Sequence, residues 1–428
     1  MAILTPLQFE DADDTQDWRA LNAGADAWFN TGSHSAGARL VWRIAELAEA
    51  AGHHPDVDLR SRGVHVRLFS HDVGGLTGRD VRLARQISAA ARDLGLSADP
   101  SAVQRMQVAI DATNIEAVAP FWQAAFRYDR VADDRLVDPL GRQPRLWFQE
   151  MTEPRPLRNR IHLDAGTPWE LVTDRIAALQ AVGGRITYEN EWWRTVADAE
   201  GNEADVFPLA AEHGTFADPG AGDWRVMLTA AVHYPTSSFV QGVELLAEVA
   251  GLADDAGVPL LIDLRYSGVT VDGGKDQHDA DGFVDLARAV QSAARGLGLV
   301  ADADAVRDFQ IGIDALDIPP VLAFWRTALG YVEDPRPGLH DLYDPRRLNP
   351  PVFFQQMDEP REQRNRIHVD LFVPADEAEV RVRAVVAAGG RVVFDAEAPD
   401  WWTLADPEGN ELDIAVTVGR AERAALQQ

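Results

Sequence analysis

The chain reads Gly52-His53-His54-Pro55-Asp56 and then, after a stretch of alternating apolar and polar residues, Ser70-His71-Asp72-Val73-Gly74-Gly75-Leu76-Thr77-Gly78-Arg79-Asp80. Together these stretches hold three of the 11 histidines in a sequence of 428 residues, followed by an acidic residue, Asp80. Imidazole groups exchange protons near pH 7, so such a cluster is typical of a site that removes water by acid–base catalysis.

The residues around this cluster predict a small domain of mixed helix and strand. Apolar residues recur at helical spacing across 40–51, and alternation predicts a strand over 57–68 with Val64, Val66 and Leu68 on one face. Residues 77–80 read Thr-Gly-Arg-Asp, a capping box that predicts the start of a second helix reaching to Leu94.

The two quoted stretches resemble the pterin-4a-carbinolamine dehydratase family, in which a His-His-Pro turn follows a helix and a third histidine ends the next strand. The resemblance implies a lyase that removes water from a 4a-hydroxytetrahydropterin without a metal or another cofactor. It assigns the catalytic roles to His53, His54 and His71, and to Asp80 at the helix start. One departure is Val57, which stands where relatives often carry an aromatic residue.

The sequence repeats itself with a period of about 206 residues, which indicates duplicated domains because solenoid repeats are far shorter. Arg158-Asn-Arg-Ile-His-Leu-Asp164 returns as Arg364-Asn-Arg-Ile-His-Val-Asp370. In the second copy of the dehydratase-like region, Val258 and Pro259 align with His53 and His54. We therefore expect that copy to be inactive and to pair with the first as a structural partner.

The rest of each half predicts a β-α-β-β-β unit that is used twice. The second copy ends in Asp406-Pro-Glu-Gly-Asn-Glu-Leu-Asp413, and this ending resembles the last hairpin of the vicinal-oxygen-chelate, or glyoxalase/bleomycin-resistance, family. We expect residues 103–212 and 304–418 each to close a cupped sheet around one cavity, with His162 and His368 pointing inward.

The resemblance places substrate-binding residues on the first strand of each module and near its end. These are Gln107, His162 and Asp205 in the first copy, and Gln310, His368 and Asp413 in the second. We predict no tightly bound metal, because glutamine offers only a neutral amide oxygen where metal-dependent relatives supply imidazole or carboxylate. A small-molecule pocket lined by aromatic residues is the alternative use; the candidates are Trp147, Phe148, Trp192 and Trp193.

The fold class predicted from these patterns is α+β, with two dehydratase-like domains alternating with two glyoxalase-like domains of paired β-α-β-β-β modules. The predicted boundaries are 1–99 for the intact dehydratase-like domain and 100–212 for the first glyoxalase-like domain. The degenerate dehydratase-like domain then spans 213–301, and the second glyoxalase-like domain spans 302–428.

Composition narrows the classes of partner. A net charge of −28 argues against nucleic acid, whose phosphates would be repelled. No stretch approaches the ~20 apolar residues of a membrane span, and no secretory signal is visible. There are no cysteines, which excludes disulfides and fits a cytoplasmic protein. We expect a small-molecule substrate, a pterin, and the family resemblance allows a homo-oligomer.

Two other functions remain open at this point. In one, the chelate-like domains carry a metal-dependent activity and the dehydratase-like domains serve as scaffold. In the other, the protein sequesters a small molecule without converting it. Bound metal at His162 or His368 would favour the first, and tight binding of an aromatic metabolite without conversion would favour the second.

Overall fold

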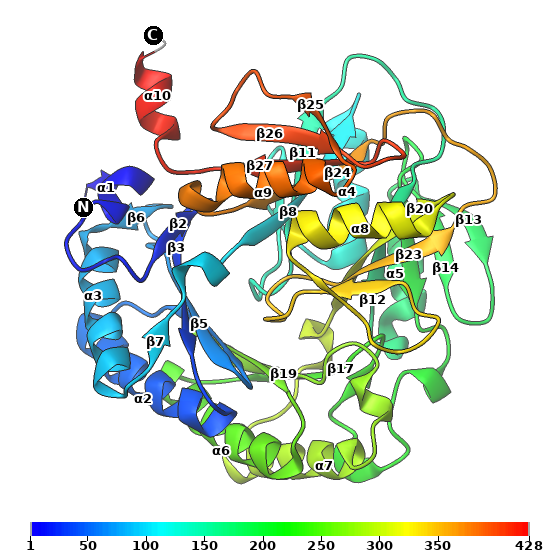
Figure 1. Cartoon of the computed structure of the whole chain (residues 1–428). Helices are drawn as coiled ribbons and strands as arrows, with labels where there is room; N and C mark the ends of the chain where they lie inside the picture. Colours follow the sequence, from blue (N-terminus) through cyan, green and yellow to red (C-terminus); the bar gives the residue numbers. More distant parts are fainter. Residues whose placement is uncertain (1, 427–428) are drawn as a thin grey trace.

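Three large β-sheets organise the computed structural model, which describes residues 2–426 (Figure 1). One sheet has nine strands and belongs to the two dehydratase-like regions, whereas the other two have eight strands each and belong to the glyoxalase-like regions. Helices and strands therefore mix throughout the chain, and the α+β class predicted from the sequence is confirmed.

The nine-stranded sheet joins the first dehydratase-like region to the second. Its strands run in the order β16-β17-β19-β18-β4-β5-β3-β2, with β7 paired to β3. Their bounds are β2 (Arg19–Leu21), β3 (Gly24–Asn30), β4 (Asp56–Arg60), β5 (Gly63–Leu68), β7 (Ser97–Ala98), β16 (Arg225–Val226), β17 (Ala230–Pro235), β18 (Leu261–Arg265) and β19 (Gly268–Asp272). The helices of these regions are α2 (His34–Ala51), α3 (Gly78–Asp93), α6 (Phe239–Ala256) and α7 (Phe283–Gly296).

The segment 57–68, predicted as one strand, is a hairpin in the structure. Strands β4 and β5 pair antiparallel, with Asp58 opposite His65, and the chain turns between Arg60 and Gly63. Val64, Val66 and Leu68 do share one face, and all three are buried in the core beneath the helices. Alternation alone cannot reveal the turn, because the apolar period continues on both sides of it.

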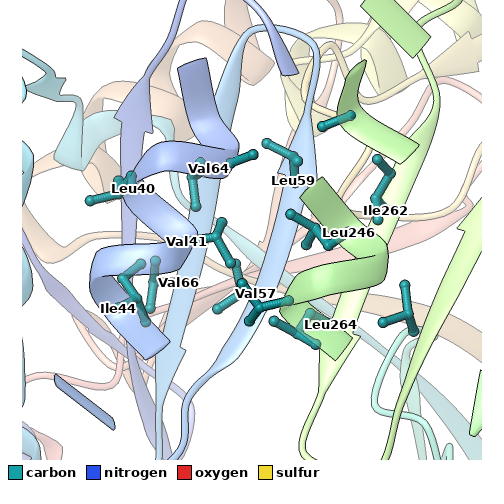
Figure 2. Close-up of a cluster of buried hydrophobic side chains, with 14 of the residues drawn as sticks. Leu40, Val41, Ile44, Val57, Leu59, Val64, Val66, Leu246, Ile262 and Leu264 are labelled. Atoms are coloured by element: carbon teal, nitrogen blue, oxygen red, sulfur yellow. The ribbon is translucent and has the colours of Figure 1, made fainter. Parts of the chain in front are cut away.

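The two dehydratase-like regions pair as expected. Strand β4 lies antiparallel to β18, with Asp58 opposite Asp263, so one sheet runs through both regions. Helices α2 and α6 pack side by side over this junction. Figure 2 shows the apolar side chains between them, which include Val41 on α2, Leu246 on α6 and Ile262 on β18.

The two eight-stranded sheets each combine strands from both halves of the chain. In the order β25-β26-β27-β24-β8-β11-β10-β9, the sheet that we call cup D joins the first module of the first half to the last module of the second half. Cup E has the order β13-β14-β15-β12-β20-β23-β22-β21 and joins the other two modules. Strand β8 pairs with β24 in cup D, and β12 pairs with β20 in cup E.

The cup strands have the following bounds: β8 (Arg105–Ala112), β9 (Asp129–Ala132), β10 (Arg135–Val137), β11 (Arg145–Glu150), β12 (Ile161–Gly166), β13 (Arg185–Glu189), β14 (Arg194–Ala197), β15 (Glu203–Phe207), β20 (Asp308–Ala315), β21 (Val332–Glu333), β22 (Asp341–Tyr343), β23 (Val352–Gln356), β24 (Ile367–Phe372), β25 (Arg391–Phe394), β26 (Trp401–Ala405) and β27 (Glu411–Ala415). The cup helices are α4 (Ile115–Phe126), α5 (Trp169–Ala181), α8 (Ile318–Leu329) and α9 (Ala375–Ala387). Helix α4 packs on α5, and α8 packs on α9.

The expectation that residues 103–212 and 304–418 each close a cup of their own is therefore wrong. The modules themselves form as predicted, but each one pairs with a module of the other half. The physical reason is that the two halves are copies, so the edge that β8 offers to β12 within its own half fits β24 equally well. Local sequence patterns do not distinguish these two partners.

Short elements complete the described chain: β1 (Ile3–Leu4), which pairs with β6 (Leu76–Thr77), and the end helices α1 (Pro6–Glu10) and α10 (Arg420–Leu426). Five 3-10 turns lie in the connections: η1 (Pro100–Ala102), η2 (Ala211–His213), η3 (Pro219–Ala221), η4 (Gln277–Asp279) and η5 (Ala303–Ala305). Among the helices of residues 2–426, none has the length and apolar character that a membrane crossing requires.

Candidate functional site

Asp80 is the centre of the predicted dehydratase site. It occupies the third position of α3, is fully buried, and closes the capping box that the sequence predicts with Thr77. Its Oδ2 atom accepts hydrogen bonds from the Thr77 backbone N–H at 2.7 Å and from the Ser70 hydroxyl at 2.7 Å. Its Oδ1 atom lies 2.7 Å from His53 Nε2. Asp80 thus caps a helix and orients a histidine at once.

The surroundings of Asp80 keep it ionised. Burial alone would raise the pKa of this carboxyl, but the hydrogen bonds from His53, Ser70 and Thr77 outweigh burial and lower it. An ionised carboxylate only accepts hydrogen bonds, so His53 carries its proton on Nε2 when it is neutral. The Nδ1 atom of His53 then keeps a free lone pair.

Helix α2 ends where the His-His-Pro turn begins. Gly52 takes the left-handed conformation, with φ of 58°, and the His53 backbone N–H donates to the Ala48 carbonyl at 3.1 Å. This αL termination is favourable for glycine, and it turns the chain so that His53 faces Asp80. Sequence and local geometry therefore agree on the position of the His-His-Pro turn.

His71 reaches the same neighbourhood through Ser70. The loop that follows β5 closes between Ser70 and Gly75, and Ser70 donates to Asp80. The His71 ring is exposed, and its edge contacts Phe69 with ring centroids 5.0 Å apart. Asp80 therefore connects the turn that carries His53 and the loop that carries His71.

His54 faces the second dehydratase-like region. Its ring lies between Phe239 and Tyr266, with ring centroids 5.1 Å and 4.9 Å away, and its Nε2 atom is 2.9 Å from Glu49 Oε1. Phe239 is buried, whereas Tyr266 is 62% exposed. The second dehydratase-like region thus supplies aromatic neighbours for His54, which local sequence patterns could not reveal because Phe239 and Tyr266 belong to the other half of the chain.

A cavity of about 250 Å³ lies between the end of α2 and the first turns of α3. It is lined by Leu47, Ala50, Ala51, Arg79, Arg82, Leu83 and Gln86. The three histidines are not among these lining residues, so this cavity is not a cleft that they share.

The second copy ends its helix in the same way but without the histidines. The Val258 backbone N–H donates to the Ala253 carbonyl at 3.1 Å, in the geometry that His53 has with Ala48. The alignment of Val258 and Pro259 with His53 and His54 is therefore sound. Neither side chain can transfer a proton.

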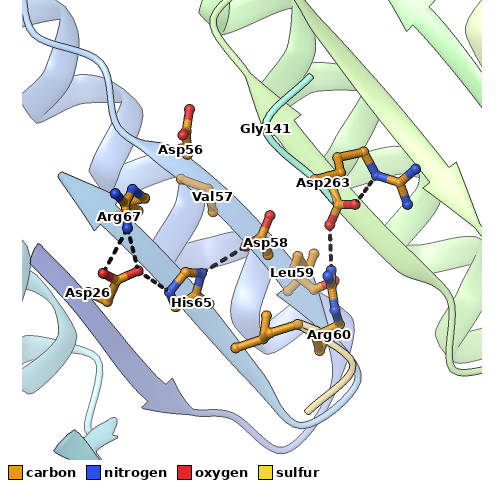
Figure 3. Close-up of polar contacts among 12 residues, drawn as sticks. Asp26, Asp56, Val57, Asp58, Leu59, Arg60, His65, Arg67, Gly141 and Asp263 are labelled. Carbon is orange, nitrogen blue, oxygen red and sulfur yellow. Dashed lines mark hydrogen bonds and ion pairs between the residues drawn. The ribbon is translucent and has the colours of Figure 1, made fainter. Parts of the chain in front are cut away.

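A different histidine, His65, is fixed inside the first region (Figure 3). Its Nδ1 atom lies 2.7 Å from Asp58 and its Nε2 atom 3.0 Å from Asp26, so both ring nitrogens face carboxylates. Burial lowers the pKa of His65, but these two hydrogen bonds outweigh it and raise the pKa overall. His65 is therefore a buried histidine whose two ring nitrogens both have hydrogen-bond partners.

In cup D, strands β8, β24 and β27 bring four polar residues together. Gln107 donates to Asp370 Oδ2 at 2.7 Å, and His368 Nε2 lies 3.5 Å from Asp370 Oδ1. The nearest donor atoms of His368, Asp370 and Asp413 lie within 4.8 Å of one another. Asp370 and Asp413 each keep a buried Oδ1 atom without a hydrogen bond among the described residues.

Cup E repeats this arrangement with His162, Asp164 and Asp205, whose nearest donor atoms also lie within 4.8 Å of one another. His162 Nε2 is 3.6 Å from Asp164 and 3.9 Å from Asp205. Gln310 lies opposite Asp164 on β20, and among residues 2–426 neither atom of its buried amide finds a hydrogen-bond partner.

Burial also raises the pKa of carboxyl groups in both cups. It raises the pKa of Asp413 to about 6, with repulsion from Asp370 as the second cause. Burial and then the charge of Asp205 raise the pKa of Asp164. Two carboxylates so close together favour an added proton, a cation or a hydrogen-bond donor between them.

Each predicted set of glutamine, histidine and aspartate is divided between the two cups. Gln107 joins His368 and Asp413, not His162 and Asp205, because β8 pairs with β24. Gln310 correspondingly joins His162 and Asp205. Sequence reasoning also missed Asp164 and Asp370, although the signal was present: each follows its histidine by two residues on a strand and so shares its face.

The aromatic pocket predicted from the sequence is wrong in its membership. Only Trp147 of the four residues lines the large cavity of about 920 Å³ in cup D, where Trp401 lies on another wall. Phe148 points to the opposite face of β11 and is buried in the core. Trp192 packs on His213 with ring centroids 4.0 Å apart, and Trp193 lies next to Tyr188 beside cup E.

Comparisons with known families agree with these two kinds of region. The model described as "Pterin 4 alpha carbinolamine dehydratase" matches residues 4–90. The model described as "Glyoxalase-like domain" matches residues 107–207 and again residues 310–415.

Individual relatives match the first region. A protein of Nocardia farcinica, provisionally named a pterin-4-alpha-carbinolamine dehydratase, is 48% identical over 79 residues, which cover 18% of this chain and 83% of the relative. One of Roseiflexus castenholzii with the same provisional name is 60% identical over 48 residues, covering 11% of this chain and 52% of the relative.

Two solved structures also align with parts of the chain. Glyoxalase I from Zea mays aligns with a TM-score of 0.39 and 10% identity, covering 76% of this chain and 97% of that one. A transcriptional coactivator/pterin dehydratase from Brucella melitensis aligns with a TM-score of 0.20 and 25% identity, covering 21% of this chain and 99% of that one.

The fold and the matches define a protein in which dehydratase-like and glyoxalase-like regions alternate. The chain belongs to the pterin-4a-carbinolamine dehydratase family, to which vicinal-oxygen-chelate domains are fused, and the pair is duplicated in tandem.

Proposed function

We propose that the chain is a 4a-hydroxytetrahydropterin dehydratase with one active site, formed by His53, His54, His71 and Asp80. The observation that supports this most is the position of Asp80, which orients His53 and, through Ser70, holds the loop of His71. The cups would bind small molecules, and the second dehydratase-like region would serve as a structural partner.

The reaction needs one group that accepts a proton and one that donates a proton. The proton on N5 of the pterin leaves, the C4a–O bond breaks, and the hydroxyl departs as water once it has received a proton. His53 is suited to accept the N5 proton, because Asp80 holds its Nε2–H and leaves Nδ1 free. His54 or His71 then donates to the hydroxyl, and the products are quinonoid dihydropterin and water.

The test is a dehydration assay with a 4a-hydroxytetrahydropterin. Replacing His53, His54 or His71 with alanine should each lower the rate by about 10²–10⁴-fold, the usual size of an acid–base contribution. His340, which is exposed on another part of the chain, provides the control variant and should retain full activity when changed to alanine. A His54→Ala/His71→Ala double variant with full activity would refute the assignment.

A second candidate function is metal-dependent chemistry in cup E. Its specific support is the donor set of His162, Asp164 and Asp205, together with the unpaired amide of Gln310. One imidazole and two carboxylates fit a borderline divalent ion such as Mn, Fe, Ni or Zn. When bound there, such an ion would polarise an oxygen atom of a substrate.

Elemental analysis of the purified chain separates the two proposals. A stoichiometric transition metal that disappears in the His162→Ala variant would establish the second candidate. Our own expectation remains that neither cup holds such an ion tightly, and a metal-free protein with full dehydratase activity would support it.

A further inference from the structure

The cavity of cup D presents on its floor two carboxylate oxygens that accept no hydrogen bond from the described residues. Asp370 lines the cavity and is only 5% exposed, and its Oδ1 atom has no hydrogen-bond partner among the described residues. The Oδ1 atom of Asp413 is in the same situation. The other oxygen of Asp370 is held by Gln107 and by the indole N–H of Trp147 at 2.8 Å, so the carboxylate cannot turn away. A ligand that satisfies these two oxygens therefore offers adjacent hydrogen-bond donors.

The walls of this cavity are flat and aromatic. Trp147 on β11 and Trp401 on β26 line it from strands on either side of the acidic floor. Trp401 is stacked on Phe394, with ring centroids 6.0 Å apart. Aromatic walls of this kind favour a planar ring as ligand, and a volume of about 920 Å³ is ample for one with a substituent.

The rim of the cavity beside Trp147 is basic. Arg145 lies two residues before Trp147 on β11, and Arg135 lies opposite Trp147 on β10. Within residues 2–426, neither arginine forms a salt bridge to a carboxylate, and Asp26, whose charge acts on Arg145, is already paired with Arg67 and Arg105. Two unpaired guanidinium groups side by side are suited to an anionic group of a ligand.

Cup E lacks the Trp147 wall and the basic rim at the corresponding positions. Phe353 takes the place of Trp147, and Asp341 takes the place of Arg135. Asp341 pairs with Lys275, whose ammonium lies 5.4 Å from the centre of the Phe353 ring. Pro351 occupies the position of Arg145. It directly precedes Val352, which pairs with Ile311 on β20. The two copies have thus diverged at Trp147, Arg135 and Arg145, whereas the acidic floor and the tryptophan of the opposite wall, Trp193 in cup E, are kept.

We propose that cup D binds a planar nitrogen heterocycle that offers two adjacent N–H donors to Asp370 and Asp413 and an anionic group to Arg135 and Arg145. The ring lies between Trp147 and Trp401. The 2-amino and N3–H edge of a pterin has this donor pattern, so an acidic pterin belongs to the class. The inference rests on the small-molecule role proposed for the cups.

Pterin-6-carboxylate is the probe, because its own fluorescence reports binding next to tryptophan. The full chain carrying His53→Ala should bind it in the presence of a chelator, since no metal is required. Asp370→Asn and Arg145→Leu should each weaken binding by about tenfold or more, the cost of losing a hydrogen bond to a charged group. Arg135→Gln changes an exposed residue and should also weaken binding, so it tests the proposal even if Asp370→Asn does not fold.

The matched comparison is Asp164→Asn, the same change on the floor of cup E, which should leave binding of the probe intact. Unsubstituted pterin and lumazine-6-carboxylate, which lack the anionic group and the 2-amino donor respectively, should bind more weakly than the probe. Loss of binding with Asp164→Asn alone, or with the chelator, would overturn the proposal.

Dehydratase activity is measured separately on the chain with His53 intact. Probe binding without any dehydration would leave the inference standing and refute the proposed catalytic function. Dehydration without probe binding would refute the inference and leave the proposed catalytic function standing.

Discussion

Charged side chains in the first dehydratase-like region form a buried network around His65 (Figure 3). The groups that surround the ring come from several strands; they are Asp26, Asp58, Arg67, Arg105 and Arg265. Burial raises the pKa of Asp26 and Asp58, but their arginine and histidine partners outweigh burial and lower it. Because Arg105 lies in β8 and Arg265 in β18, the network ties three regions of the chain together.

The pH dependence of stability follows from the directions of these shifts. The pKa of His65 is raised above its ordinary value of 6.5, so its contribution is complete below that value and is lost as the pH rises through the folded pKa. The pKa values of Asp26 and Asp58 are lowered, so their contribution is lost as the pH falls below about 4. The network should be most stabilising in mildly acidic solution.

Replacing His65 with leucine should lower the free energy of unfolding by about 3 kcal/mol near pH 6, because two buried carboxylates lose their shared partner. Urea denaturation from about pH 6 to pH 9 measures this. The difference between wild type and variant should shrink as the pH rises. A difference that stays constant over this range would show that His65 is not charged in the folded protein.

At the scale of single elements, local patterns predicted most of what formed. The helix at 115–126 and the strand at 107–111 appear where the periodicity placed them, because both depend on neighbours within a few residues. The Thr77–Asp80 capping box is present as predicted. By contrast, β2 and β3 were not foreseen, since their apolar residues show no clean alternation.

The partners of the elements were harder to predict. Gln107 lies beside His368 instead of His162, although both histidines occur in the same Arg-Asn-Arg-Ile-His context. Identical local sequences give two pairings of equal quality, and only contacts between distant parts of the chain decide between them. The aromatic neighbours of His54 were missed for the same reason, because Phe239 and Tyr266 belong to the other half.

One side chain joins the two central helices. Asp254, near the end of α6, accepts hydrogen bonds from the backbone N–H groups of His34 at 3.0 Å and Ser35 at 2.9 Å, at the start of α2. A carboxylate at a helix N-terminus satisfies free donors and interacts favourably with the helix dipole. Although burial acts against it, these hydrogen bonds lower the pKa of Asp254.

Changing Asp254 to alanine should therefore lower the free energy of unfolding by about 1–2 kcal/mol at neutral pH. Asp255 is exposed and sits next to it, so Asp255→Ala is the matched control and should change little. Denaturant titration of both variants gives the comparison. Equal stability of the two variants would mean that Asp254 does not act as a cap between the regions.

At the scale of the whole molecule, the two copies that make up the chain contribute strands to the same sheets. The dehydratase-like regions share one sheet through β4 and β18, and the cups exchange modules through β8–β24 and β12–β20. Every large sheet therefore contains strands from both halves. Such an arrangement resembles a homodimer in which the second half of the chain takes the place of the second subunit. The segment near residue 217 joins the two halves covalently.

Residues 1–217 and 218–428, produced together as separate chains, should accordingly assemble into a 1:1 complex. Each half alone leaves the edges of its central strands unpaired, and such edges associate with any matching strand. Residues 1–217 alone should form a dimer, because β8 and β12 of two copies can pair as β8 and β24 do here. Size-exclusion chromatography with light scattering measures both outcomes. A stable, monomeric first half would show that β8 pairs with β12 of its own chain, and the exchange of modules between the cups would then be refuted.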